Sequence, residues 1–120
     1  MIHKISEIIS MVPEFTEKVY ATGPSKEILT SADIFFMQIP PFYRKILSID
    51  NLTINDGGTI SMDWMVRKDF VSVEVGANRV GFFSEMPDGS NPEGVFTLDT
   101  ECPKAISNAL DMLYGKNISQ

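Results

Sequence analysis

A chain of 120 residues with 43% apolar and 22% charged side chains is long enough for one folded domain and too apolar for a disordered segment. Its ten Lys and Arg residues against sixteen Asp and Glu residues give a net charge of −6, which excludes the basic surface that nucleic-acid binding requires. The sequence also lacks the roughly 18 consecutive apolar residues of a membrane span. We therefore expect one domain, residues 1–120, with neither nucleic acid nor a membrane as its partner.

Residues 1–47 are predicted to be mainly helical. Apolar side chains recur at helical spacing before Pro13, at Ile2, Ile5, Ile8, Ile9 and Val12. Ser25 is a suitable N-cap for a second helix, which the two prolines after Ile39 would end. Its apolar residues are Ile28, Ala32, Phe35, Phe36 and Ile39. The run 34–37 could instead be a buried strand, because a short apolar run does not distinguish strand from helix.

Residues 48–99 are predicted to form an antiparallel sheet, because the hydrophobic period changes to two from Ile49. The expected strands cover residues 49–54, 60–66, 70–75, 79–86 and 95–99. Short turns separate the first four, and a loop rich in Pro and Gly precedes the last. Strict alternation around Trp64 predicts that this side chain lies in the core.

Residues 100–115 are predicted to form a C-terminal helix that packs on the sheet. Thr100 is the expected N-cap, and Gly115 stands where a left-handed residue would end the helix. The apolar stripe comprises Ile106, Ala109, Leu110 and Leu113. The pattern thus predicts a two-layer α+β domain with N-terminal helices, an antiparallel meander of four or five strands and a C-terminal packing helix.

Two stretches of the chain resemble a pattern found in small uncharacterised bacterial proteins. They are Tyr20-Ala21-Thr22-Gly23-Pro24-Ser25 and, after a helix and Pro41, Asp56-Gly57-Gly58-Thr59-Ile60-Ser61-Met62-Asp63-Trp64. The shared part runs from the Gly-Pro loop to the Gly-x-Ile-x-Met-Asp-Trp strand and covers about half of the chain. The resemblance implies a bacterial or phage source and a helix after Ser25, and it implies no activity or catalytic residue.

The single histidine and single cysteine restrict the chemistry that the chain can perform. His3 is interpreted as a solvated side chain, since a metal site needs several ligands and a general base needs an ordered setting. The macrodipole of the last helix could activate the Cys102 thiol, but burial against that helix is the favoured interpretation. One cysteine, and charges at Lys4 and Glu7 where a signal peptide would be apolar, indicate a cytoplasmic protein. We expect no metal and no cofactor.

Alternation in the sheet predicts one face that mixes acidic and apolar side chains. The candidate binding residues on it are Asp63, Met65, Phe70, Glu74 and Glu85, joined by Phe83 if its strand has the same orientation. Exposed Met and aromatic residues with a charged rim are typical of protein interfaces. The three carboxylates could also supply a general acid and a general base, or simply be a solvated sheet face.

The main hypothesis is a non-enzymatic, acidic protein-interaction domain of bacterial or phage origin. It would neutralise a protein partner, as antitoxin, immunity and anti-defence proteins do. Two alternatives stay open: a small-molecule-binding or hydrolytic domain that uses the Asp63, Glu74 and Glu85 face, and a structural subunit of a homo-oligomer. The main hypothesis requires one face of the sheet to be free of helices.

Overall fold

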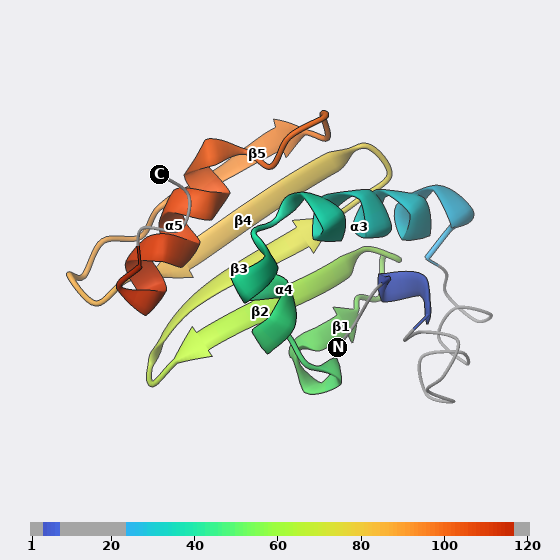
Figure 1. The fold of residues 1–120 in the computed structure, drawn as a ribbon. Coiled ribbons are helices and arrows are strands. Elements are labelled where there is room, and N and C mark those ends of the chain that lie inside the picture. Colours follow the sequence, from blue (N-terminus) through green and yellow to red (C-terminus); the bar gives the residue numbers. More distant parts are fainter. Residues whose placement is uncertain (1–3, 8–23, 117–120) are drawn as a thin grey trace.

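The computed structural model describes residues 4–7 and 24–116, in which helices pack on one side of a five-stranded sheet (Figure 1). Residues 5–7 are helical, and Ile5 is fully buried in the core. The predictions for His3, for the remainder of the first helix and for the Gly-Pro loop up to residue 23 lie outside the described residues.

The sheet is an antiparallel meander in which each strand pairs with the next one along the chain. Its strands are β1 (Leu52–Ile54), β2 (Ile60–Val66), β3 (Asp69–Val75), β4 (Arg79–Glu85) and β5 (Glu93–Thr97). The predicted hairpin before β2 is confirmed, since Gly58 N donates to Asn55 O at 2.8 Å. The predicted α+β class is therefore confirmed, with the antiparallel sheet following the N-terminal helices along the chain and preceding the C-terminal helix.

Two strands, β1 and β5, begin two or more residues from their predicted starts, and β5 also ends two residues earlier than predicted, at Thr97. Residues 49–51 form a 3-10 turn instead of strand, because the Ser48 hydroxyl donates to the Asn51 side chain at 2.7 Å and Asn51 N donates to Ser48 O at 3.0 Å. Strand β5 begins two residues earlier than expected, at Glu93, because Gly94 and Glu93 pair with Phe82 and Phe83 of β4.

Helix α3 (Lys26–Gln38) forms where the second helix was predicted. The Ser25 hydroxyl accepts a hydrogen bond from Ile28 N at 3.3 Å, which confirms the expected N-cap. Phe35 and Phe36 are fully buried side chains of this helix, so the strand alternative for residues 34–37 is wrong. Short helix α4 (Pro41–Ile46) follows, with proline at its first position, where no backbone donor is needed.

Helix α5 (Lys104–Tyr114) is shorter than predicted at its start. Thr100 does not cap it, and Pro103 occupies the N-cap position without a side-chain hydrogen bond. The reason is local, since a proline disfavours helical geometry at the residue before it, here Cys102. Gly115 ends the helix with φ 65°, which confirms the predicted left-handed cap.

The core lies between the helices and one face of the sheet. Trp64 is only 2% exposed, as predicted, and its indole Nε1 donates to the carbonyl oxygen of Tyr43 at 3.0 Å. The Tyr43 hydroxyl in turn donates to Asp111 Oδ1 at 2.5 Å, so one buried chain of contacts joins β2, α4 and α5.

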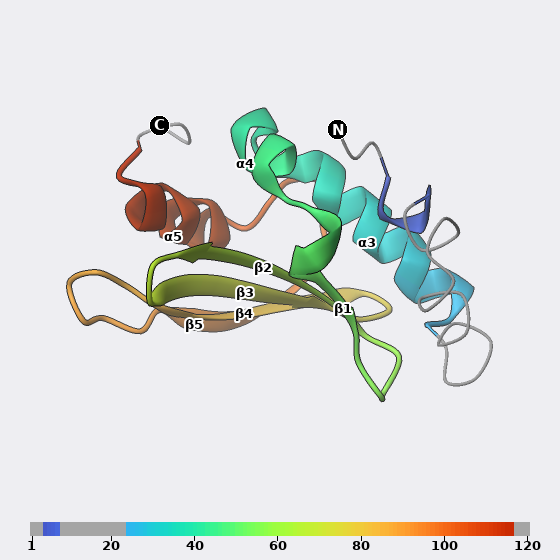
Figure 2. The same cartoon turned by 90° about the horizontal axis from the view of Figure 1, so that it is seen from below.

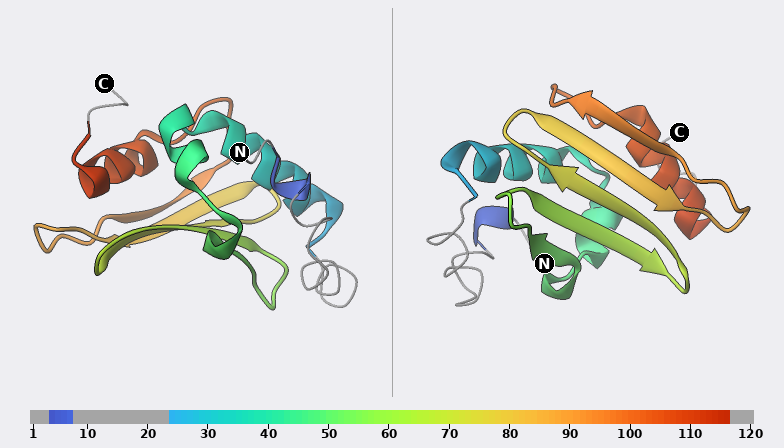
Figure 3. Two further views of the ribbon diagram at one scale, coloured as in Figure 1. Left: turned by 60° about the horizontal axis from the view of Figure 1, so that its bottom comes forward. Right: turned by 180° about the vertical axis from the view of Figure 1, so that it is seen from behind.

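The described helices α3, α4 and α5 all lie on the same side of the sheet (Figure 2). Seen from behind, the sheet carries no described helix in front of it (Figure 3, right). Among the described residues, no helix combines the length and the hydropathy of a membrane span. The sheet therefore presents one whole face that the described part of the chain does not cover.

Candidate functional site: the open face of the sheet

The uncovered side of strands β2 to β5, which we call the open face, consists of outward-pointing side chains at alternate positions. Its acidic members are Asp63, Glu74, Glu85 and Glu93, and its large apolar members are Met65, Phe70, Phe83 and Val95. All five predicted binding residues lie on this face, in the orientation that the alternation predicted. Whether they bind a partner stays a prediction.

The apolar part of the open face spans four strands. Met65, Phe83 and Val95 are 59%, 52% and 69% exposed, and each comes from a different strand. Phe70 is partly buried against Phe83, with the two ring centroids 5.5 Å apart and the ring planes at 80°. This edge-to-face geometry is favourable for aromatic rings and gives the pair a defined orientation.

The register separates Glu85 from Glu74 and makes Asp63 and Glu74 diagonal neighbours on adjacent strands. Asp63 lies opposite Ser72, whereas Glu74 lies opposite Ser61 and Gly81. Glu85 stands four residues along β4 from Gly81, so it is roughly 13 Å along the sheet from Glu74. Catalysis by paired carboxyl groups requires them to converge on one reacting bond, and this register does not bring Glu74 and Glu85 together.

Two of the carboxylates already have partners within the sheet. Asp63 Oδ1 accepts a hydrogen bond from the Ser72 hydroxyl at 2.5 Å, and Glu74 Oε2 accepts one from the Thr59 hydroxyl at 2.5 Å. By contrast, among the residues that the structure describes, no hydrogen bond or ion pair engages the side chains of Glu85 and Glu93. These two carboxylates are the ones available to a binding partner.

The sequence argument did not place Glu93 and Val95 on the open face, and it included Phe83 only conditionally. The prediction began the last strand at Val95, so Glu93 was assigned to the preceding loop with Pro92 and Gly94. The alternation from Glu93 to Thr97 was the signal that could have found the correct start. In the structure, Phe83 pairs directly with Glu93, which brings both side chains to the open face.

Cys102 lies just before the start of α5 and has a raised thiol pKa. It is partly buried against the core, two residues before α5 begins, and its Sγ lies 3.7 Å from the carbonyl oxygen of Pro103. Burial raises the pKa of the Cys102 thiol to about 11, so the thiol is protonated at neutral pH. The packing interpretation of this residue is therefore confirmed.

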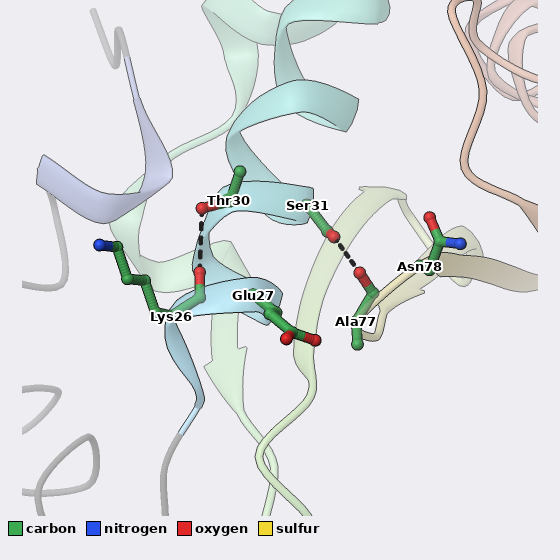
Figure 4. A pocket seen from close by; sticks show the side chains of 6 residues that line it. All are labelled: Lys26, Glu27, Thr30, Ser31, Ala77 and Asn78. Atoms are coloured by element: carbon green, nitrogen blue, oxygen red, sulfur yellow. Dashed lines mark hydrogen bonds between the residues drawn. The ribbon is translucent and has the colours of Figure 1, made fainter.

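Two grooves lie away from the open face, and each offers few contacts to a ligand. A groove of about 650 Å³ lies between the first turns of α3 and the β3–β4 turn (Figure 4). Its hydroxyl groups are already used, since Ser31 donates to Ala77 O at 2.5 Å and Thr30 donates to Lys26 O at 2.9 Å (Figure 4). The other polar side chains at this groove, Lys26, Glu27 and Asn78, are exposed and therefore provide few fixed contacts for a small molecule.

A further groove of about 620 Å³ runs along α3, where Ile34 and Met37 are exposed beside Asp99. Asp33 at its edge accepts hydrogen bonds from both the backbone and the hydroxyl of Ser6, so this carboxylate has a structural role. Within residues 4–7 and 24–116, no three His, Cys, Asp or Glu side chains are placed to hold a metal ion.

Comparisons with protein-family models, with curated proteins and with solved structures found no match for this chain. The expected bacterial or phage source therefore stays a prediction. Function has to be inferred from the open face and its chemistry.

Proposed function

We propose that the protein is a non-enzymatic interaction domain that binds a protein partner on its open face. The observation that carries this proposal is the contiguity of the exposed apolar side chains. Scattered exposed apolar residues are normal on any protein, but here Met65 on β2 and Val95 on β5 flank the Phe70–Phe83 pair, so four neighbouring strands contribute apolar side chains. Acidic residues surround them, which is the apolar centre and polar rim of a protein interface.

The dimensions of the open face suit a protein partner better than a small molecule. Strands of up to seven residues at about 3.3 Å per residue, and four strands about 4.8 Å apart, give a face of roughly 23 by 19 Å. Its planar area, roughly 440 Å², is about half of the accessible surface, about 800 Å² per partner, that a standard protein complex buries. A flat face of this kind does not enclose a small ligand.

The proposed activity is neutralisation of the partner, in a protein of bacterial or phage origin. Covering a functional surface of the partner would be sufficient for such an activity, and it requires no chemical step from this chain. An antitoxin, an immunity protein or an anti-defence protein acts in this way.

A matched pair of photo-crosslinking variants tests the proposal in the source organism. Benzoylphenylalanine replaces Phe83 on the open face in one variant and Met112 on α5 in the other, two side chains that are 52% and 47% exposed. We expect a discrete cross-linked adduct with another protein from position 83 and not from position 112. Adducts from position 112 alone, or the same adducts from both positions, would contradict the proposal, and an adduct with a second copy would support the homo-oligomer alternative.

A further inference from the structure

The open face carries more acidic than basic side chains, and this excess of negative charge restricts which partners can cover its apolar centre. Four carboxylates lie on it, and the cation among its described strand residues is Arg79, at the far end of β4 opposite Thr97. Arg67 and Lys68 lie beyond its other end, in the turn between β2 and β3. Between its two ends, the open face therefore carries a net negative charge around its apolar side chains, which favours an occupant of positive charge.

The two carboxylates without partners lie directly beside the aromatic pair. Glu85 is the cross-strand neighbour of Phe70, and Glu93 is the cross-strand neighbour of Phe83. Side chains in directly opposite positions have Cβ atoms about 4.5–5.5 Å apart, so each ring has a carboxylate within reach of the same bound group. Because Phe83 is 52% exposed, an incoming group can contact its ring.

We propose that the partner covers the open face with arginine side chains set among apolar residues, an inference that rests on the proposed function. A guanidinium is planar, so it can stack on the Phe83 ring and donate hydrogen bonds to the carboxylates of Glu85 and Glu93 at the same time. Lysine presents a compact and strongly hydrated charge, which combines these two contacts less well. The apolar residues of the partner contact Met65 and Val95, which lie on either side of the aromatic pair.

A second copy of this chain fits the same surface poorly. Two open faces stacked on each other would bring together two sets of four carboxylates, and Arg79 on each face with Arg67 and Lys68 at its end would offset them only in part. Like charges placed opposite one another across an interface are unfavourable and exclude wrong partners. The charge of the open face therefore favours binding of a basic partner over self-association.

The test uses a displayed library of random short peptides, selected on the immobilised wild-type protein with the Phe83→Ser variant as the counter-selection. We expect selected peptides to be enriched in arginine beside apolar residues and depleted in Asp and Glu. Nuclear magnetic resonance of the ¹⁵N-labelled protein then locates the bound peptide, with the largest shift changes expected at Ser72, Phe83 and Glu93.

Substitutions in the protein and in the peptide separate the contributions. Phe83→Leu keeps an apolar side chain without the ring, and it should weaken the binding of the selected peptide about two- to fivefold. Glu85→Gln and Glu93→Gln should each weaken it by up to about fivefold and reduce its salt dependence. Glu101→Gln makes the same charge change at an exposed position off the open face and should leave binding unchanged. Replacing the peptide's arginine by lysine should weaken binding to the wild type more than to Phe83→Leu.

The outcomes distinguish the two proposals. Selected peptides that lack arginine but still shift the open-face resonances would overturn the arginine inference and leave the proposed function standing. Selected peptides that bind elsewhere would contradict both. A concentration-dependent dimer in sedimentation that Phe83→Ser abolishes would identify a second copy as the occupant and overturn the inference.

Discussion

Removing the Tyr43 hydroxyl by Tyr43→Phe probes the buried contact that joins α4 to α5. The hydroxyl donates to Asp111 Oδ1 at 2.5 Å, and both residues are buried. Phenylalanine keeps the edge-to-face contact with Phe42, whose ring centroid lies 5.3 Å from that of Tyr43. A hydrogen bond to a carboxylate contributes about 1.5–3 kcal/mol, so the free energy of unfolding at pH 7 should fall by about 2 kcal/mol.

The same variant should respond differently to alkaline pH. Burial, and then the hydrogen bond and the charge of Asp111, raise the pKa of Tyr43 above its ordinary value of 10. The unfolded chain therefore loses this proton near pH 10 while the folded protein keeps it, so the contribution of Tyr43 to stability is complete below pH 10 and is lost as the pH rises above it. At pH 11 the wild type should have lost about 1.4 kcal/mol through Tyr43, and the gap to Tyr43→Phe should narrow from about 2 to about 0.6 kcal/mol.

Urea unfolding followed by far-ultraviolet circular dichroism at pH 7, 9, 10 and 11 measures both effects. The other groups that ionise at alkaline pH are the same in both proteins, so their contributions drop out of the difference in unfolding free energy between wild type and Tyr43→Phe. A gap between the two proteins that stays constant from pH 7 to pH 11 would show that Tyr43 titrates normally in the folded state. A gap near zero at pH 7 would show that the hydrogen bond adds no net stability.

Three further predictions concern single residues. Trp64→Ala should lower the free energy of unfolding by about 3–5 kcal/mol, and native wild-type fluorescence should be blue-shifted; emission like that of free tryptophan would contradict the buried position. Cys102 should react slowly with a thiol reagent at neutral pH in the folded protein and rapidly in urea, because burial raises its pKa to about 11; equal rates would refute this. Gly115→Ala should lower the free energy of unfolding by about 1 kcal/mol, because φ is 65° at this position. No atom lies within 4 Å of an added Cβ, so the cost comes from the backbone and not from a clash. An unchanged midpoint of thermal unfolding would argue against the left-handed cap.

The sheet could be predicted closely because alternation is a local property of the chain. Two residues per repeat place Trp64 on the buried face, and the same repeat places Asp63 and Met65 on the other. A shift of one residue would have exchanged the two faces, which is why long strands with a clear alternation specify their orientation so strongly. The open face and its five predicted residues follow from this regularity.

What could not be predicted depends on contacts between distant segments. The pairing of Phe83 with Glu93 is set by the β4–β5 register, and no local pattern reveals it. The hydrogen bond between Tyr43 and Asp111 joins residues 68 positions apart and has no counterpart in the hydrophobic periodicity. Whether helices cover one face or both is likewise decided by packing, so the sequence alone could not establish that the described helices leave the open face uncovered.

The acidic residues of the open face have a simpler explanation, which is that they keep a water-facing sheet solvated. This explanation accounts for the acidic side chains but not for the exposed apolar ones. Solvation would be served equally well by polar, strand-favouring residues at every outward position, such as the Thr53 of β1. Instead, Met65, Phe83 and Val95 occupy outward positions with more than half of their side-chain surface exposed. Exposure of this apolar surface to water is unfavourable, and burial by a partner would stabilise the complex by about 25 cal/mol for each Å² covered. On the proposed function, Glu85 and Glu93 beside the rings would select among partners, because they would repel an identical acidic face and attract a basic one.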